Sequence, residues 1–164
     1  STQSRSSAAS DVYKRQMEHQ AQLALRPGPV RVDVIVDPPW SDGQINSVQV
    51  VTGDRPFLVD TVVSCLLRHG WRVEDVRHPI IGVKRDRGTI EAVGTPGRGG
   101  CASESWIHID VTAPLGTDIG QAAEQLRDDL CACLDQVVCA TDDWGAMHEA
   151  MLRTAELVLS LIHI

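Results

Sequence analysis

The chain is poor in aromatic residues and in positive charge. Phenylalanine and tyrosine occur once each, and aromatic residues make up 4% of the sequence. Lysine and arginine number 15 against 22 acidic residues, which gives a net charge of −7. Nucleic-acid binding requires clustered cations that neutralise phosphates, and an RNA-binding sheet also needs exposed aromatic residues. The composition therefore predicts that the chain binds no nucleic acid.

Long apolar runs are also lacking. The apolar tail at residues 157–164 is far shorter than the roughly 20 residues that a membrane-spanning helix needs. Five cysteines, an odd number in a chain without a secretion signal, predict reduced thiols in a cytoplasm rather than a disulfide framework. Hydrophobic residues make up 43% of the sequence, enough for one globular domain with a core. Lys84 is the single lysine of residues 17–158, a bias that fits a GC-rich bacterial genome.

No spacing typical of a phosphate loop or of a metal site is present. Residues 94–100 are rich in glycine, but the Lys-Ser/Thr pair of a P-loop is missing and no helix is predicted to follow. Cys131 and Cys133 stand two apart on a predicted helix, so their side chains point to different sides. No second Cys or His pair stands at zinc-finger spacing. The sequence predicts a plain loop and no metal site.

Catalytic residues cannot be assigned from spacing either. His78, His108 and Cys101 are chemically suited to act as nucleophile and base, but no spacing links them. The carboxylates of Glu74–Asp75 and Asp128–Asp129 are adjacent in sequence, so on a strand or helix they diverge and are expected to be solvated. We expect no catalytic residue and no cofactor in this chain.

Both ends of the chain resemble translated adapter DNA. Codons that spell Ser6–Gln16 can reproduce a transposon-based sequencing adapter, and codons for Leu159–Ile164 can reproduce its reverse complement. We therefore interpret residues 1–16 as a disordered artefact and residues 159–164 as a second artefact, and we expect neither to contribute to the fold. Residues 17–29 are expected to be a linker, residues 30–140 a domain, and residues 141–158 a helical extension.

Hydrophobic periodicity predicts the elements of that domain. Alternating patterns indicate strands at residues 30–36, 47–53, 89–93 and 104–111, with residues 71–85 extended. Helical patterns follow residue 54 and residue 118, the second continuing as two helices or one kinked helix, with a strand at 136–140 as the alternative. The order predicts an α+β fold, a ferredoxin-like antiparallel sheet with helices packed on one face.

A strand passes directly into a helix around residue 54. Asp54 is a suitable helix cap, and Pro56 fits a first helical turn, where its missing N–H costs nothing. Gly70 is expected to end the helix. Phe57, at the helix start, is expected to bury its ring against the sheet.

The stretch around this turn carries a resemblance to a known family. Its pieces are Gly53-Asp54-Arg55-Pro56-Phe57-Leu58-Val59-Asp60-Thr61-Val62, Arg68-His69-Gly70, His78-Pro79, Val83-Lys84-Arg85-Asp86, Glu104-Ser105-Trp106-Ile107-His108-Ile109 and Asp142-Asp143-Trp144-Gly145-Ala146-Met147. Together, in this order over residues 48–147, they resemble the amino-terminal region of the large bacterial NAD-specific glutamate dehydrogenases.

The resemblance implies an ACT-like domain that lies ahead of a catalytic domain. The parent would convert L-glutamate, NAD and water to 2-oxoglutarate, ammonia and NADH, with its nicotinamide site far downstream. This chain would then be a non-catalytic regulatory or assembly domain. Its partners would be other domains of a homo-oligomeric parent. The alternative is a free-standing ligand-binding or protein-interaction module.

ACT domains more widely carry an Asp-Arg-Pro-Gly-Leu turn that can hold an amino-acid carboxylate on helix-start N–H groups. The resemblance therefore implies an effector site at Asp54, Arg55, Pro56 and Phe57. Phe57 stands where that turn has glycine. Because its ring is expected to fill the space beside the turn, we expect free amino acids to bind weakly or not at all.

Overall fold

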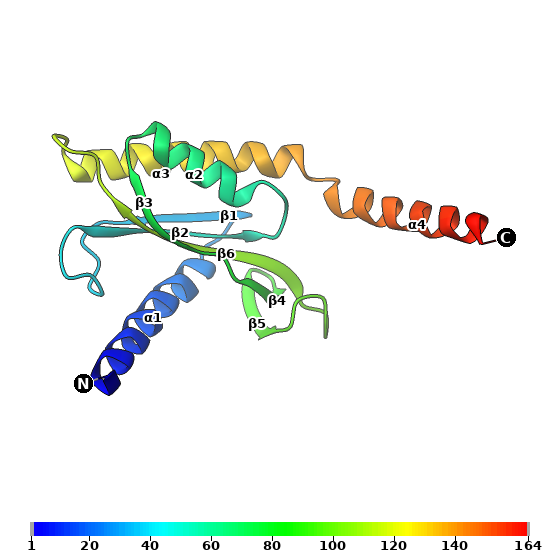
Figure 1. Cartoon of the computed structure of the whole chain (residues 1–164), viewed down its shortest axis with the longest axis horizontal. Coiled ribbons are helices and arrows are strands. Elements are labelled where there is room, and N and C mark those ends of the chain that lie inside the picture. Colours follow the sequence, from blue (N-terminus) through cyan, green and yellow to red (C-terminus); the bar gives the residue numbers. More distant parts are fainter. Residues whose placement is uncertain (1, 164) are drawn as a thin grey trace.

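The computed structural model describes residues 2–163, with side chains from residue 7 onward, as an antiparallel sheet flanked by helices (Figure 1). Within this range it has four helices and six strands: α1 Thr2–Ala24, β1 Val30–Ile35, β2 Ile45–Gly53, α2 Leu58–Arg68, β3 Arg72–Arg77, β4 Ile80–Asp86, β5 Thr89–Gly94, β6 Ala102–Thr112, α3 Ile119–Ala140 and α4 Trp144–Ile162. The predicted α+β class is confirmed.

Strand β6 is central to the sheet. One edge of β6 pairs with β2, and β1 continues the sheet beyond β2. The other edge pairs with β4 near its beginning and with β3 near its end, and β5 continues beyond β4. Pro79 lies at the break between β3 and β4, where its carbonyl accepts the Trp106 N–H at 3.1 Å. Because proline has no N–H to donate, the extended stretch predicted for residues 71–85 is two strands.

Helices α2 and α3 cover one face of the sheet and form the main core with it. The side chains that meet there are at most 2% exposed, and each contributes about 1.5–3 kcal/mol when fully buried. They are Val48, Val50, Ile107 and Ile109 of the central strands, Leu58, Val62 and Leu66 of α2, and Leu126, Leu130 and Leu134 of α3.

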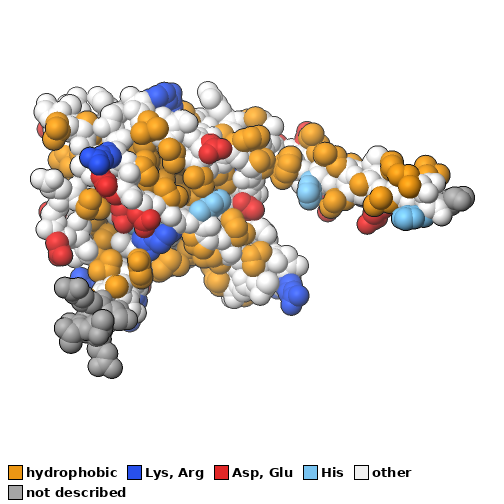
Figure 2. Space-filling model, in the orientation of Figure 1, with side chains coloured by type: hydrophobic (Ala, Val, Ile, Leu, Met, Phe, Trp, Pro, Cys, Tyr) orange, Lys and Arg blue, Asp and Glu red, His pale blue; other side chains and the backbone are white. Residues whose placement is uncertain are grey.

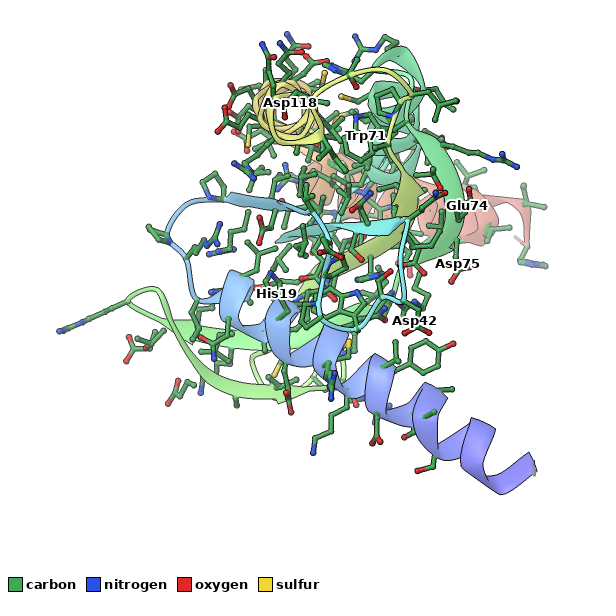
Figure 3. All side chains as sticks on the ribbon, turned by 90° about the vertical axis from the view of Figure 1, so that its left-hand side faces the viewer. His19, Asp42, Trp71, Glu74, Asp75 and Asp118 are labelled. Carbon is green, nitrogen blue, oxygen red and sulfur yellow. The ribbon has the colours of Figure 1, made fainter. Side chains whose placement is uncertain are left out.

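Helix α1 covers the opposite face, as Figure 3 shows for the side away from α3. Alternate residues of a strand point to opposite faces, so Val51 meets Leu23 and Ala24 of α1 in a second, smaller core. The Gln20 side chain donates a hydrogen bond to the Ile107 carbonyl at 2.9 Å, and it is 1% exposed. The prediction had placed helices on one face only, and α1 adds a third layer.

The beginning of the chain differs from the expected boundaries. Residues 1–16 were predicted to be disordered and residues 17–29 a linker, but α1 runs to Ala24, which leaves 25–29 as the connection. The Tyr13 ring lies 4.7 Å below the Arg77 guanidinium, and the Gln16 carbonyl accepts a hydrogen bond from Gln49 at 3.0 Å. Tyr13 and Gln16 therefore do contact the sheet. The hydrophobic pattern does not reveal these contacts, because α1 buries the side chains of Gln16 and Gln20.

Arg85 connects α1 to the sheet through a partly buried ion pair. Its guanidinium donates two hydrogen bonds to the Glu104 carboxylate, at 2.8 and 3.1 Å, and a third to the Ala24 carbonyl at the end of α1, at 2.8 Å. Burial acts to raise the pKa of Glu104, but the hydrogen bonds and charge of Arg85 outweigh burial. With further help from Trp106 and Arg31, the pKa of Glu104 is lowered.

Helix α4 projects away from the sheet (Figure 1). Residues 136–140 belong to α3, so the alternative of a strand there is wrong, and a short turn separates α3 from α4. Among the described residues of α4 none is buried, and hydrophobic side chains are exposed along it (Figure 2). The predicted helical extension reaches Ile162 rather than residue 158.

Candidate functional site

The candidate site is the turn that connects β2 to α2. Helix α2 begins at Leu58, and the residue at its N-cap is Phe57 rather than Asp54. Phe57 has a left-handed backbone, with φ 72° and ψ 8°. Pro56 precedes the cap and lies outside the helix. The predicted cap at Asp54 is wrong because the Asp54 carboxylate is bonded elsewhere.

Asp54 is held by β6. Its N–H donates to the Ser103 carbonyl at 2.9 Å, and its carboxylate accepts the Ser105 hydroxyl at 2.7 Å. The same Ser105 oxygen lies 3.0 Å from Nε2 of His78. Since a carboxylate only accepts, Ser105 gives its proton to Asp54 and accepts the N–H of His78.

This order of residues does not activate the serine. In a Ser-His-Asp triad the histidine stands between the other two and removes the serine proton. Here the serine stands in the middle and already gives its proton to Asp54, while His78 donates to it. The three residues therefore fix the turn against β6 and the β3–β4 connection and supply no nucleophile.

Arg55 ties the turn to the end of α3. Its guanidinium Nη1 donates to the Val138 carbonyl at 3.2 Å and to the Thr141 hydroxyl at 3.4 Å. Its Nε donates to the Gly53 carbonyl at 3.3 Å. A cation is favoured at a helix C-terminus, where unpaired carbonyls carry partial negative charge. The turn is thus held from β6 on one side and from α3 on the other.

Phe57 is exposed, which corrects the prediction that its ring packs against the sheet. The side chain is 66% exposed, while its neighbour Leu58 is 2% exposed. The left-handed backbone at position 57 turns the chain so that Leu58, not Phe57, enters the core. The hydrophobic pattern alone did not distinguish these two adjacent apolar residues.

The start of α2 is open to a partner. Among the side chains of residues 7–163, none accepts a hydrogen bond at the Phe57 cap position. The first N–H groups of a helix carry partial positive charge and need acceptors from outside the helix. At the other end of α2 the backbone groups are paired: the Gly70 N–H donates to the Leu67 carbonyl at 3.1 Å, and the Trp71 N–H donates to the Leu66 carbonyl at 3.0 Å. Gly70 has φ 77° and ends the helix, as predicted.

The other chemical candidates lie apart from this turn, except His78. His108 is buried on the α1 side of the sheet, 3.0 Å from both Gln49 and Asp110. Cys101 is half-buried and ends the glycine-rich loop, where its carbonyl accepts the Gly97 N–H at 3.1 Å.

A shallow pocket of about 330 Å³ opens where α3 begins. Trp71 and Asp118, labelled in Figure 3, both line it. The Asp118 carboxylate caps α3 by accepting the N–H groups of Gly120 and Gln121, at 2.9 and 3.3 Å. This helix start is therefore already neutralised, in contrast to the start of α2.

Sequence reasoning missed a group of side chains between α2 and α3, here called the thiol cluster: Cys65, His69, Asp129 and Cys133. The Asp129 carboxylate lies 2.8 Å from His69 Nε2, 3.4 Å from Cys65 Sγ and 3.6 Å from Cys133 Sγ. Asp129 was expected to be solvated, but it faces α2. In the sequence these residues form two pairs with i, i+4 spacing, Cys65 with His69 and Asp129 with Cys133. About 60 residues separate the two pairs, and the spacing typical of zinc fingers does not connect residues so far apart.

Ionisation in the thiol cluster is strongly perturbed. Burial, followed by the hydrogen bond and charge of Asp129, raises the pKa of the Cys65 thiol to about 12. The hydrogen bond from His69, then that from Cys65, lowers the pKa of Asp129.

The fold and the strand-turn-helix site define a small α+β domain of the ACT-like type. The family model for the ACT1 domain of glutamate dehydrogenase matches residues 2–130 of this sequence. The chain therefore belongs to the glutamate dehydrogenase ACT1 domain family and is a domain of a larger dehydrogenase chain. The match includes residues 2–16, whose origin in adapter DNA stays a prediction.

The helices give no indication of a membrane span. Among those in the described part of the chain, none combines the length and the apolar character needed to cross a bilayer.

Proposed function

We propose that this chain is a non-catalytic regulatory and assembly domain of a cytoplasmic bacterial glutamate dehydrogenase that is specific for NAD. The parent would oxidatively deaminate L-glutamate to 2-oxoglutarate and ammonia with reduction of NAD. Membership of the ACT1 family supports the dehydrogenase parent. The NAD specificity rests on the resemblance over residues 48–147.

The exposed Phe57 carries the assembly role. A left-handed backbone costs an L-residue about 1–2 kcal/mol, and a large exposed aromatic side chain gains little in return. The hydrogen bonds of Asp54 and Arg55 hold the turn in this conformation from two sides. Strain that is retained in this way points to a contact with another molecule or domain. Phe57 is thus suited to anchor another domain of the parent in a homo-oligomer.

The test is made in the full-length parent enzyme. Phe57→Gly removes the ring and fits the left-handed backbone, so the turn itself is kept. We expect the variant to shift the parent toward smaller assemblies in analytical ultracentrifugation. Leu115→Ala, at a leucine that is 97% exposed beyond the far end of β6, is the matched control and should leave assembly unchanged. Unchanged assembly of the Phe57→Gly parent would refute the role of this turn.

The chain by itself should lack dehydrogenase activity. We assign it no catalytic residue and no cofactor site, because no dinucleotide fingerprint is present and the serine of the turn is not activated. Purified chain mixed with glutamate and NAD should give no NADH absorbance. Turnover that is abolished by a substitution in this chain would contradict the proposal.

A second candidate is a small-ligand-binding module that uses the same turn. The uncapped start of α2 favours it, since N–H groups there suit a carboxylate, while the exposed Asp54 carboxylate suits an ammonium group. Calorimetric titration with a panel of amino acids distinguishes the two candidates. Saturable binding at one site that is lost in Asp54→Asn would favour ligand binding over assembly.

A further inference from the structure

The thiol cluster brings together four residues whose side chains can bind metals, and they come from α2, its C-cap and α3. Cys65 of α2 and its C-cap residue His69 lie one turn apart, and Asp129 and Cys133 lie one turn apart on α3. Residues four apart share one face of a helix, and here the two faces meet. The ligand atoms of Cys65, Asp129 and Cys133 all lie within 4.8 Å of one another.

The distances fit a tetrahedral zinc ion. Zinc bonds of about 2.3 Å to sulfur and 2.0–2.2 Å to oxygen place tetrahedral ligands roughly 3.4–3.8 Å apart. Asp129 Oδ2 lies 3.4 Å from Cys65 Sγ, and Asp129 Oδ1 lies 3.6 Å from Cys133 Sγ. Since one ligand atom from each residue lies within 4.8 Å of the other two, small side-chain shifts are enough for two sulfurs and one carboxylate oxygen to contact one ion.

The donor set selects the kind of metal. Two thiolates with one carboxylate suit a thiophilic ion such as Zn²⁺, whereas Mg²⁺ and Ca²⁺ require oxygen ligands. Binding releases the two thiol protons to solvent and leaves two thiolates and one carboxylate around a divalent ion, a net charge of −1. The Arg68 guanidinium balances this charge, because it lies 3.3 Å from Cys133 Sγ and 3.5 Å from the Asp129 carboxylate.

We propose that Cys65, Asp129 and Cys133 bind one zinc ion that links α2 to α3. His69, 2.8 Å from the Asp129 carboxylate, orients this ligand from outside the coordination shell. A solvent molecule completes the tetrahedron. Cys65 is fully buried, while Asp129 and Cys133 are half-buried, so the ion reaches the cluster from the side of α3.

The experiment titrates the full 164-residue chain with Co²⁺ under reducing conditions, followed by competition with Zn²⁺. We expect one equivalent of Co²⁺ to give thiolate charge-transfer absorption and the intense visible bands of a tetrahedral ion, both removed by Zn²⁺. Cys133→Ser and Asp129→Asn should lose these bands. His69→Ala should keep them with an affinity roughly 10–100-fold lower, as found for residues that orient a ligand.

The chain supplies its own control. Cys131→Ser changes a half-buried cysteine on the same helix that lies outside the thiol cluster, and it should bind like the unsubstituted chain. Zn²⁺ should also raise the melting temperature of the unsubstituted chain and of Cys131→Ser, but not that of Cys133→Ser. Circular dichroism checks that each variant is folded.

Several results would overturn the zinc site. They are the absence of cobalt bands in the unsubstituted chain, equal affinity of a folded Cys133→Ser or Asp129→Asn variant, and loss of binding in Cys131→Ser. Each of these readouts is independent of dehydrogenase activity and of the assembly role of Phe57.

Discussion

Phe57 offers the sharpest test of the turn geometry. Two adjacent apolar residues, Phe57 and Leu58, have opposite environments, with 66% and 2% of their surfaces exposed. Phe57 also has a left-handed backbone, at φ 72°. Substitution of these neighbours should therefore have very different effects on the free energy of unfolding.

The magnitudes follow from burial and backbone strain. About one third of the Phe57 surface is buried, so Phe57→Ala should cost roughly 0.5–1 kcal/mol out of the 1.5–3 that full burial supplies. Phe57→Gly loses the same contacts and about 0.5–1 kcal/mol of chain entropy, but it relieves about 1–2 kcal/mol of left-handed strain. The glycine variant should thus be as stable as the alanine variant or more stable. Leu58→Ala should cost about 2–5 kcal/mol.

Urea denaturation of the isolated chain, followed by circular dichroism, measures all three variants against the unsubstituted chain. Leu58→Ala is the matched control, since it lies one residue away on the same segment. If Phe57→Ala cost 3 kcal/mol or more, or if glycine at position 57 were clearly less stable than alanine, the exposed left-handed turn would be refuted.

Three further predictions concern the fold. Gly82→Ala should cost about 3 kcal/mol or more in urea denaturation, because an added Cβ would lie 2.6 Å from the Thr95 backbone, whereas Gly43→Ala has open space and should be nearly neutral. Glu104→Gln should cost roughly 2–4 kcal/mol by breaking the partly buried pair with Arg85. Since the pKa of Glu104 is lowered on folding, the stability that its carboxylate contributes is present above the usual carboxyl pKa of 4.5 and is lost as the pH falls further. Acid titration should therefore destabilise the unsubstituted chain more than the variant. Deletion of residues 2–12 or of residues 159–163 should leave the melting temperature unchanged. Deletion of residues 2–16 should lower the melting temperature by several degrees, because the contacts of Tyr13 and Gln16 are lost. Equal melting temperatures for the two N-terminal deletions would contradict the packing of α1 on the sheet.

Local patterns in the sequence were enough to predict most helices and strands and the α+β fold class. Alternation placed β1 and β6, helical spacing placed α2 and α3, and Gly70 marked the end of α2 because a left-handed residue is needed there. The family could also be inferred from the sequence, because the short motifs that resemble it follow one another in the same order along the chain. These features depend on residues close together in the chain, which is why periodicity and turn chemistry reveal them.

Contacts between distant segments decided the rest. The N-cap of α2 is Phe57 rather than the predicted Asp54, because the Asp54 carboxylate accepts a hydrogen bond from Ser105, 51 residues away. Helix α1 was hidden because it buries glutamines, whose polar side chains become favourable in a core only where strand carbonyls accept their hydrogen bonds. The thiol cluster requires α2 and α3 to lie side by side on one face of the sheet. Such arrangements depend on which surfaces meet, and a local pattern carries no information about its partner.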